Sequence, residues 1–508
     1  MSARPQVLQL NPKDNVAIAF SALPQGVVLE GFPAVTTLDP IPPAHKVAIR
    51  DVAKGEAVYR YGQIIGFATQ DIQAGQHVHV QNLAIGEFSR DYAFGADLHP
   101  VAPAEEVRTF MGIRRGDGRV ATRNYIGVVS TVNCSATVTK QVVRHFSMPG
   151  ALAAWPNVDG VVPITHGYGC CIDTHGEGLE QLRRTLQGYV HHPNFAAVVI
   201  IGLGCEANQM APLLLGQRDK TGAELVPLVM QELGGTRLTV EAGIKAVEAL
   251  LPHADAVRRE PLPIGHLSLA LQCGGSDGYS GITANPALGV AVDLLVSHGG
   301  TAILSETPEI YGAEHLLTRR AVNHEVGQKI VDRIHWWEAY AKREHGSIDN
   351  NPTPGNKAGG LTTILEKSLG AVAKSGSTPL TDVLRYAEPL KTKGLVFMDA
   401  PGYDPIGATG QVACGANLVL FTTGRGSCFG AKPAPSMKIA TNTPMFQRLP
   451  EDMDINAGEI MDGEVTVQQK GREIFEALIE LASGRPSHSE ALGLGDEEFV
   501  PWMIGAQM

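Results

Sequence analysis

The chain has few aromatic residues and no long apolar run. Phe, Trp and Tyr make up 6% of its 508 residues. No apolar stretch approaches the ~18 residues that a membrane span needs. The opening segment, MSARPQVLQLNPKDN, also lacks the apolar core of a secretory signal. We therefore expect a cytoplasmic protein without a membrane partner.

Basic residues are in deficit as well. Lys and Arg number 41 against 52 Asp and Glu, which gives a formal net charge of −11. Nucleic acids bind to basic surfaces, so we expect no nucleic-acid partner. A small anionic substrate remains compatible with this charge, because a few cations in a cleft can reverse the local field.

The first 97 residues differ in pattern from the rest of the chain. Short apolar runs separated by Gly, Pro and Asp predict a β-rich module over residues 1–97, with strands at 16–20, 46–49, 57–59 and 64–68. Residues 98–108, which include the Pro- and Ala-rich LHPVAPAE, are the expected linker.

Residues 109–258 and 259–508 are the two expected parts of an α/β region. Apolar runs of strand length alternate with helix-like stretches, such as 179–190 and 240–251, which indicates a mainly parallel sheet. The expected strands are 127–132, 158–164, 197–201, 267–271, 294–296, 302–305, 394–398 and 418–422.

Four of these apolar runs end at or near a cysteine, and the thiols are Cys134, Cys170, Cys205 and Cys273. Ligands bind beyond the carboxyl ends of strands in open α/β sheets, so three or four thiols could converge if the strands share a sheet. Thiolates select iron–sulfur clusters, zinc and similar centres. The alternative is that each thiol fills a small gap in the core. We interpret Cys171, Cys414 and Cys428 as packing or incidental thiols.

Several long motifs stand out in the chain: CGGSDGYSGITANP (273–286), GLGCE (202–206), GYGC (167–170), NPTPGNKAGG (351–360) and FTTGRGS (421–427). Together they resemble the altronate/galactarate dehydratase family. The N-terminal motifs DNVAIA (14–19), HKVAIRD (45–51) and RYGQIIGFA (60–68) extend the resemblance over nearly the whole chain. Their order makes the match highly specific.

The resemblance implies an N-terminal β-clip module of the SAF type, followed by the two-part α/β region. It also implies iron-dependent dehydration of an aldonic or aldaric acid to a 2-keto-3-deoxy acid. Some relatives carry the module on a separate small subunit and act as sulfolactate sulfo-lyases, so the fusion favours the sugar-acid branch.

The motifs divide between two substrates. HVHVQN (77–82) and PEIYGAEHLL (308–317) resemble altronate dehydratases, whereas LLTRRAVNHEVG (316–327) and DMDINAG (452–458) resemble galactarate dehydratases. The stretch GSCFGAKPAPSMKIATN (426–442) departs from the form typical of both. We expect D-altronate as the substrate, with galactarate as the alternative.

This reaction removes a proton beside a carboxylate and expels hydroxide from the next carbon. A Lewis-acidic metal assists both events, and a positioned base adds roughly 10²–10⁴-fold. The implied metal is iron, either Fe²⁺ or an iron–sulfur cluster held by Cys134, Cys170, Cys205 and Cys273. A mononuclear Fe²⁺ held by His and carboxylates is the rival. No nucleotide cofactor is expected, because no GxGxxG or GxxxxGK[ST] motif occurs in the required strand–helix setting.

Candidate catalytic residues come mainly from histidines. His77 and His79 alternate with Val78 and Val80, so both imidazoles face one side of a strand. The alternative is an exposed polar strand face. The complete candidate set is His45, Lys46, His77, His79 and His166.

Candidate substrate contacts lie in the family motifs. Arg425 follows an apolar run, and its guanidinium suits a bidentate carboxylate contact. The other candidates are Arg123, Asn124, Ser276, Asp277, Thr283, Asn285, Lys357 and Lys438. Those at 276–285 could instead cap a helix that starts near Ala287.

Two other functions stay open at this point. Another lyase reaction, such as sulfolactate cleavage, could use the same scaffold, and a sugar-acid binding protein could use the module alone. A binding protein would not need four thiols at strand ends. A small anionic sugar acid is the expected partner, together with further copies of the chain in a homo-oligomer.

Overall fold

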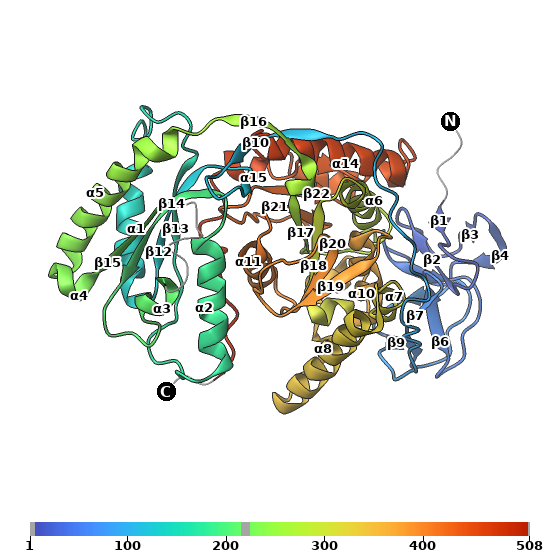
Figure 1. Ribbon diagram of the computed structural model, residues 1–508. Helices are drawn as coiled ribbons and strands as arrows, with labels where there is room; N and C mark the ends of the chain where they lie inside the picture. Colours follow the sequence, from blue (N-terminus) through green and yellow to red (C-terminus); the bar gives the residue numbers. More distant parts are fainter. Residues whose placement is uncertain (1–5, 215–223, 506–508) are drawn as a thin grey trace.

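The computed structural model describes residues 6–214 and 224–505. Three parts follow one another along the chain (Figure 1): the β module (residues 6–86), the second domain (residues 112–255) and the C-terminal domain (residues 264–505). The C-terminal domain lies between the other two in this view. Residues 98–108 contain no helix or strand.

The β module consists of short antiparallel strands. Its strands are β1 (Val7–Leu8), β2 (Val16–Ala19), β3 (Val28–Leu29), β4 (Phe32–Thr36), β5 (Lys46–Ala48), β6 (Ala57–Arg60), β7 (Gln63–Ala68), β8 (His77–Val78) and β9 (Leu83–Ala84). They form sheets in the orders β1-β2-β5-β8, β6-β7-β9 and β3-β4. The β-rich fold expected for this segment is therefore present.

A small antiparallel sheet joins the two larger domains. Strand β10 (Thr109–Arg114) pairs with β16 (Arg259–Pro263) and β11 (Val120–Ala121). The chain thus enters the second domain along β10 and leaves it for the C-terminal domain along β16, and these two strands pair with each other.

The second domain has a parallel sheet in the order β13-β12-β14-β15. The strands are β12 (Tyr125–Ser130), β13 (Gly160–Ile164), β14 (Phe195–Gly202) and β15 (Glu224–Val229), and the helices are α1 (Asn133–Phe146), α2 (Glu177–Val190), α3 (Met210–Leu214), α4 (Met230–Leu233) and α5 (Thr236–Asp255). Every residue of β14 is buried, as a strand covered on both faces requires.

The C-terminal domain has a seven-stranded parallel sheet in the order β19-β20-β18-β17-β21-β22-β23. Its strands are β17 (Ser268–Cys273), β18 (Thr301–Ser305), β19 (Leu380–Leu384), β20 (Gly394–Met398), β21 (Leu418–Thr423), β22 (Ser436–Ala440) and β23 (Ile455–Asn456). Its helices are α6 (Ala284–Ser297), α7 (His315–Thr318), α8 (His324–Arg343), α9 (Pro354–Ala358), α10 (Ile364–Val372), α11 (Asp404–Cys414), α12 (Thr443–Arg448), α13 (Glu459–Asp462), α14 (Val467–Ala482) and α15 (His488–Ala491). The α/β class with mainly parallel sheets is confirmed.

One expected strand is wrong. Residues 294–296 belong to α6 rather than to the sheet. Three consecutive apolar residues are too short a run to separate a strand from a buried helix by periodicity. Helix α6 packs against α14, which explains its apolar character.

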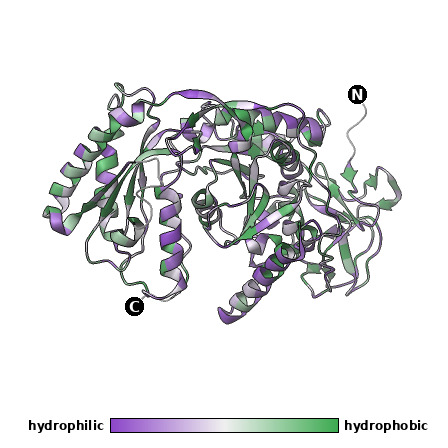
Figure 2. Cartoon of the chain, in the orientation of Figure 1, coloured by the Kyte–Doolittle hydropathy of each residue, from purple (hydrophilic) through white to green (hydrophobic). Residues whose placement is uncertain are grey.

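The apolar residues gather in the sheets. Figure 2 shows the strands of both parallel sheets in green, whereas helices such as α2 and α5 are banded with purple. Within residues 6–214 and 224–505, no helix combines the length and apolarity needed to cross a membrane.

Candidate functional site

Three histidines of the β module meet at its contact with the C-terminal domain. One ligand nitrogen from each of His45, His77 and His79 lies within 4.8 Å of the others. His45 Nδ1 and His77 Nε2 share a hydrogen bond at 2.9 Å, and His45 Nε2 lies 3.3 Å from the carbonyl oxygen of Ala358. Strands β5 and β8 bring the first two together, because Val47 pairs with His77 across them. We call these three residues the His triad.

The His triad fits a metal ion. Burial lowers the pKa of His45, lowers that of His77 to about 4, and lowers that of His79 to about 3. The imidazoles are therefore neutral at pH 7, the state that ligates metals. His79 Nδ1 is buried and has no hydrogen-bond partner. No other group of His, Cys, Asp or Glu in the described residues is this close-set.

A buried ion-pair network holds the module against the C-terminal domain. Glu366 on α10 accepts from Lys46 Nζ at 2.9 Å and from Arg60 Nη1 at 2.5 Å. Lys46 also donates to the Gly360 carbonyl at 2.7 Å, and Arg60 to the Gly278 carbonyl at 2.6 Å. Lys46, expected as a catalytic residue, thus uses two of its N–H donors for contacts within this buried network.

A cavity of about 510 Å³ lies beside the His triad, at the same domain contact. The module contributes residues 20–22 and 42–44, so the wall ends at Ala44, next to His45. Ala358, whose carbonyl oxygen lies 3.3 Å from His45 Nε2, also lines the cavity. Arg425 and Arg448 supply two cations to this wall. Volumes of this size accommodate small organic ligands.

Several expected substrate contacts surround this cavity. Asp277 lines it and accepts hydrogen bonds at 2.9 to 3.1 Å from the side chains of Ser280, Thr441 and Asn442. Burial raises the pKa of Asp277. Ser276 precedes it and is also buried. Lys357 lies on α9 next to Ala358, at the edge of the same wall.

The other expected substrate contacts form hydrogen bonds and an ion pair within the protein. Arg123 forms a two-pronged pair with Glu490 at 2.6 and 2.8 Å, and Asn124 accepts from Arg115 at 2.8 Å. In the C-terminal domain, Thr283 donates to the Thr441 carbonyl at 2.8 Å, Asn285 to the Gly370 carbonyl at 2.9 Å, and Lys438 to the Ser427 carbonyl at 3.0 Å. These five residues are not among those that line the cavity.

His166 also lies apart from the triad. It belongs to the second domain, where Tyr168 N–H donates to its Nδ1 at 3.2 Å. Its Nε2 therefore carries the proton and donates to the Ser130 carbonyl at 3.1 Å. Both ring nitrogens are occupied, and burial lowers the pKa of His166 to about 4. The structure places it as a support of the loop after β13.

Of the four expected thiol ligands, Cys273 lies in a different sheet from the other three. Cys134, Cys170 and Cys205 follow strands of the second domain, whereas Cys273 ends β17 in the other sheet. Cys273 is buried, and its Sγ accepts from Lys374 Nζ at 2.8 Å. Cys414 is buried as well, with its Sγ 3.2 Å from the Met398 sulfur, whereas Cys171 and Cys428 are exposed.

A cluster of buried acids at the carboxyl end of the C-terminal sheet was not predicted from the sequence. Glu306 follows β18 with a left-handed φ of +75°, a strained conformation for a residue with a side chain. Its Oε1 is buried without a hydrogen-bond partner. Glu309 pairs with Lys367, accepts from Asn351 at 2.9 Å and lies 3.5 Å from Cys273 Sγ.

The charges in this cluster do not balance. Glu306, Glu309 and Asp404 face two cations, Lys367 and Lys374. Burial raises the pKa of Glu306 well above its ordinary value, and the charge of Glu309 raises it further. Burial also raises the pKa of Asp404 to about 7. Glu309 is different, because the two lysines outweigh burial and lower its pKa. The cluster therefore holds a proton near neutral pH.

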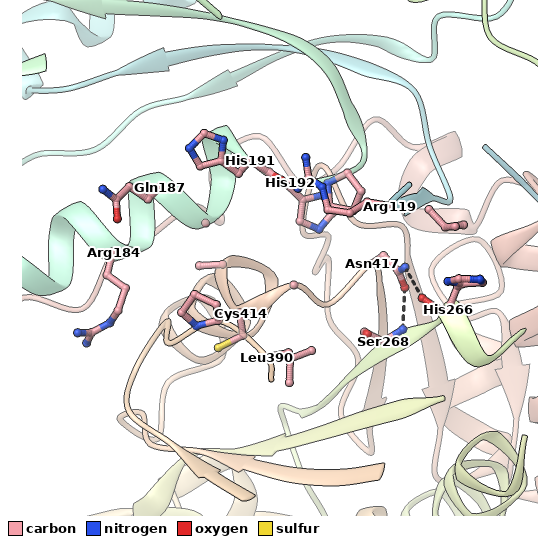
Figure 3. A pocket seen from close by; sticks show the side chains of 16 residues that line it. Arg119, Arg184, Gln187, His191, His192, His266, Ser268, Leu390, Cys414 and Asn417 are labelled. Atoms are coloured by element: carbon pink, nitrogen blue, oxygen red, sulfur yellow. Dashed lines mark hydrogen bonds between the residues drawn. The ribbon is translucent and has the colours of Figure 1, made fainter. Parts of the chain in front are cut away.

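A second cavity, of about 610 Å³, lies between α2 and the C-terminal domain (Figure 3). Arg184 and His191 line one side of it, and Cys414 and Asn417 the other. Asn417 accepts from the Ser268 N–H at 2.9 Å, so this wall is part of the sheet scaffold. The cavity is larger than the first but has none of the expected site residues in its wall.

Comparison with known proteins shows which domain families the chain matches. Residues 5–86 match the altronate/galactarate dehydratase SAF domain, residues 112–255 the second domain of D-galactarate dehydratase/altronate hydrolase, and residues 264–507 the C-terminal domain of D-galactarate/altronate dehydratase. These three ranges together cover nearly the whole chain.

Relatives that match over nearly their whole length support the same family. The altronate dehydratase of Bacillus subtilis is 37% identical over 481 residues, covering 94% of this chain and 95% of the relative. The altronate dehydratase of Escherichia coli is 36% identical over 96% of this chain and 97% of the relative. The L-threo-forming galactarate dehydratase of Escherichia coli is 36% identical over 96% of this chain and 95% of the relative.

An α/β scaffold with a clustered histidine site and these relatives defines a carbon–oxygen lyase of the hydro-lyase type. The chain belongs to the D-galactarate/altronate dehydratase family.

Proposed function

We propose that this protein dehydrates D-altronate to a 2-keto-3-deoxy acid, with Fe²⁺ held by the His triad. The observation that carries the proposal is the His triad beside a 510 Å³ cavity with two arginines in its wall. The identity to altronate dehydratases over more than nine-tenths of the chain supports the substrate. A six-carbon sugar acid needs a carboxylate contact and several hydroxyl contacts, and the cavity wall offers both.

Bound iron would act as a Lewis acid that assists departure of the hydroxyl group. The chain's own residues do the rest. Arg425 is exposed in the cavity wall and can grip the substrate carboxylate with two parallel N–H donors. Asp277 and Asn442 line the same wall, where they can bind substrate hydroxyls. Thr441 and Ser280 hold Asp277 in place for this role.

Proton transfer falls to the buried acid cluster. The loop from Cys273 to Asp277 connects this cluster to the cavity. Glu309 stays ionised beside Lys367 and is the proposed proton acceptor. Glu306 retains a proton and is the proposed donor to the departing oxygen. Two acids whose pKa values are pushed apart by their surroundings are a recurring arrangement in acid–base catalysis.

The test is a dehydratase assay of anaerobically iron-loaded protein against a panel of aldonates and aldarates, with the 2-keto-3-deoxy product measured. His77→Gln should abolish turnover, whereas the exposed His335→Gln should leave it unchanged. Arg425→Lys should raise KM at least tenfold, because Lys cannot make the two-pronged contact. The exposed Arg472→Lys is its control. Full activity of His77→Gln, or no product from any sugar acid, would exclude the proposal.

Galactarate is the second candidate. The segments 316–327 and 452–458 favour it, and the galactarate relative is as similar as one of the altronate relatives. The two substrates differ at one end, where galactarate carries a second carboxylate. Arg448, the second cation in the cavity wall, is suitably charged to receive it. The ratio of kcat/KM for the two acids decides between them.

A further inference from the structure

The second domain presents a group of exposed thiols that the proposed function does not use. Its sheet places β13, β12 and β14 side by side, all parallel. Cys134 follows β12 at the start of α1, Cys170 and Cys171 follow β13, and Cys205 follows β14. All four thiols are exposed. We call them the thiol group.

Backbone hydrogen bonds tie the three loops together right beside the thiols. Asn133 N–H, next to Cys134, donates to the Tyr168 carbonyl at 2.9 Å. On the other side, Ala207 N–H donates to the carbonyl of Cys170 itself at 3.1 Å, two residues after Cys205. The three loops that carry the thiols are therefore joined into one surface.

Glycine allows this close approach. Gly169 has a φ of +99°, and a Cβ there would lie 2.6 Å from the Thr131 carbonyl oxygen. Gly204, next to Cys205, has a φ of +125°. Both positions exclude other residues by conformation and, at Gly169, also by space. The loops are thus built to bring their following cysteines over the ends of the strands.

The thiols influence one another. Cys170 Sγ and Cys171 Sγ are 3.8 Å apart. Cys134 and Cys205 both lie close enough to Cys170 to interact with it electrostatically.

Core packing does not account for these residues. Cys273 and Cys414 show what packing thiols look like here, because both are buried. A Cys that fills a gap in the core has no reason to face solvent. Four solvent-facing thiols on three adjoining loops instead suit a soft metal centre.

The thiol group is not among the close-set metal-binding groups of the described residues, which disfavours a single ion. A lone tetrahedral ion with metal–sulfur bonds of about 2.3 Å needs all its sulfurs within about 4 Å of one another. The close-set groups in the described residues include only the His triad, so the thiol group is spread more widely. The outer thiolates of an iron–sulfur cluster stand roughly 6–7 Å apart, since bridging sulfides and several irons lie between them.

We propose that Cys134, Cys170 and Cys205 ligate an iron–sulfur cluster in the second domain, separate from the His triad. Cys171 is the neighbouring thiol that does not ligate it, because its sulfur is too close to that of Cys170 for both to hold different irons. Three protein thiolates leave one coordination position of the cluster without a cysteine. The C-terminal domain stands between this site and the β module in Figure 1.

The experiment measures iron and acid-labile sulfide per chain in the full-length protein, purified without oxygen and reconstituted with ferrous iron and sulfide. Sulfide is the deciding readout, because the His triad binds no sulfide. Cys134→Ser, Cys170→Ser and Cys205→Ser should each lose at least four-fifths of the sulfide and the visible sulfide-to-iron absorbance. Cys171→Ser and Cys428→Ser, both exposed thiols, are the matched controls and should retain them.

Further variants keep this result apart from the proposed function. His77→Gln should keep the sulfide while it loses dehydratase activity. Circular dichroism and gel filtration identify any Ser variant that fails to fold, and for such a variant Cys→Ala at the same position replaces it. Absence of sulfide from the reconstituted protein, stoichiometric zinc without sulfide, or retention of sulfide in all three ligand variants would overturn the proposal. Loss in Cys171→Ser with retention in Cys170→Ser would overturn the ligand assignment.

Discussion

Replacing Glu366 with Gln should loosen the β module from the C-terminal domain while the C-terminal sheet stays folded. Glu366 accepts from Lys46 and Arg60 at 2.9 and 2.5 Å, and the three side chains are at most 1% exposed. Gln preserves the volume but removes the charge, so two buried cations lose their counter-ion. Breaking a buried ion pair from one side costs about 3–5 kcal/mol.

The lowered pKa of Glu366 gives a second, independent value for the free energy that this ion pair contributes. Burial alone would raise it, but the charges of Lys46 and Arg60 lower it from 4.5 to about 2. At 1.36 kcal/mol per pKa unit, the difference corresponds to about 3 kcal/mol. Because the folded-state pKa is lowered, this stability is present above pH 4.5 and is lost as the pH falls toward 2. The cost of breaking the ion pair and the pKa shift of Glu366 thus both indicate a stabilisation of about 3 kcal/mol at neutral pH.

Hydrogen exchange read by mass spectrometry tests the prediction. Peptides that cover β2 and β5 should exchange on the order of 100-fold faster in Glu366→Gln, while peptides that cover β18 and β20 should not change. Glu476→Gln is the control, since its pair with Arg108 is 38% and 55% exposed and should contribute at most about 1 kcal/mol. Equal protection of the module in both variants would refute the reasoning.

Three further changes test other parts of the structure. Cys273→Ser should cost about 1–2 kcal/mol in urea unfolding without altering bound iron, and iron loss would restore Cys273 as a ligand. Gly188→Ala should cost about 1–3 kcal/mol, because its Cβ would lie 2.2 Å from the Ala413 carbonyl, and unchanged stability would disprove this close helix contact. The pKa of Asp404 is raised to about 7, so the wild type loses stability as pH rises from 3.8 through 7. Asp404→Asn lacks this loss, so its free energy of unfolding should rise relative to that of the wild type by on the order of 1–4 kcal/mol between pH 5 and 8. A difference between the two proteins that does not change with pH would contradict this prediction.

The strands of the parallel sheets could be predicted because burial on both faces leaves a strong local signal. AAVVIIG at 196–202 reads as a strand, and β14 covers it. The same signal failed at residues 294–296, where a helix is buried just as completely and the run is too short for its period to show.

Sheet membership could not be predicted, and the position of Cys273 in a separate sheet illustrates this. Local pattern shows that a cysteine ends a strand, but the pairing of strands is a property of the whole fold. Cys134 and Cys273 have similar surroundings in sequence, yet β12 and β17 lie in different sheets. Arg123 illustrates the same limit, since its partner Glu490 is 367 residues away.

Glu306 could have been predicted from the sequence as a candidate site residue. It comes directly after the apolar run 302–305, which is the position that singled out the four cysteines. A carboxylate at a strand end deserved the same weight, because the end of a parallel sheet is where ligands bind. Its left-handed backbone and unpartnered oxygen, by contrast, appear only in the folded structure.

The proposed active site depends on contact between two folding units. The β module supplies all three histidines, and the C-terminal domain supplies Arg425, Asp277 and the buried acids. Neither unit holds both the metal donors and the anion-binding groups. Glu366 sits between them, and its neighbour along α10, Lys367, pairs with Glu309. A shift of α10 would therefore move the support of His45 and the partner of the proposed base together, so metal affinity and proton transfer should fail together in variants that loosen this contact.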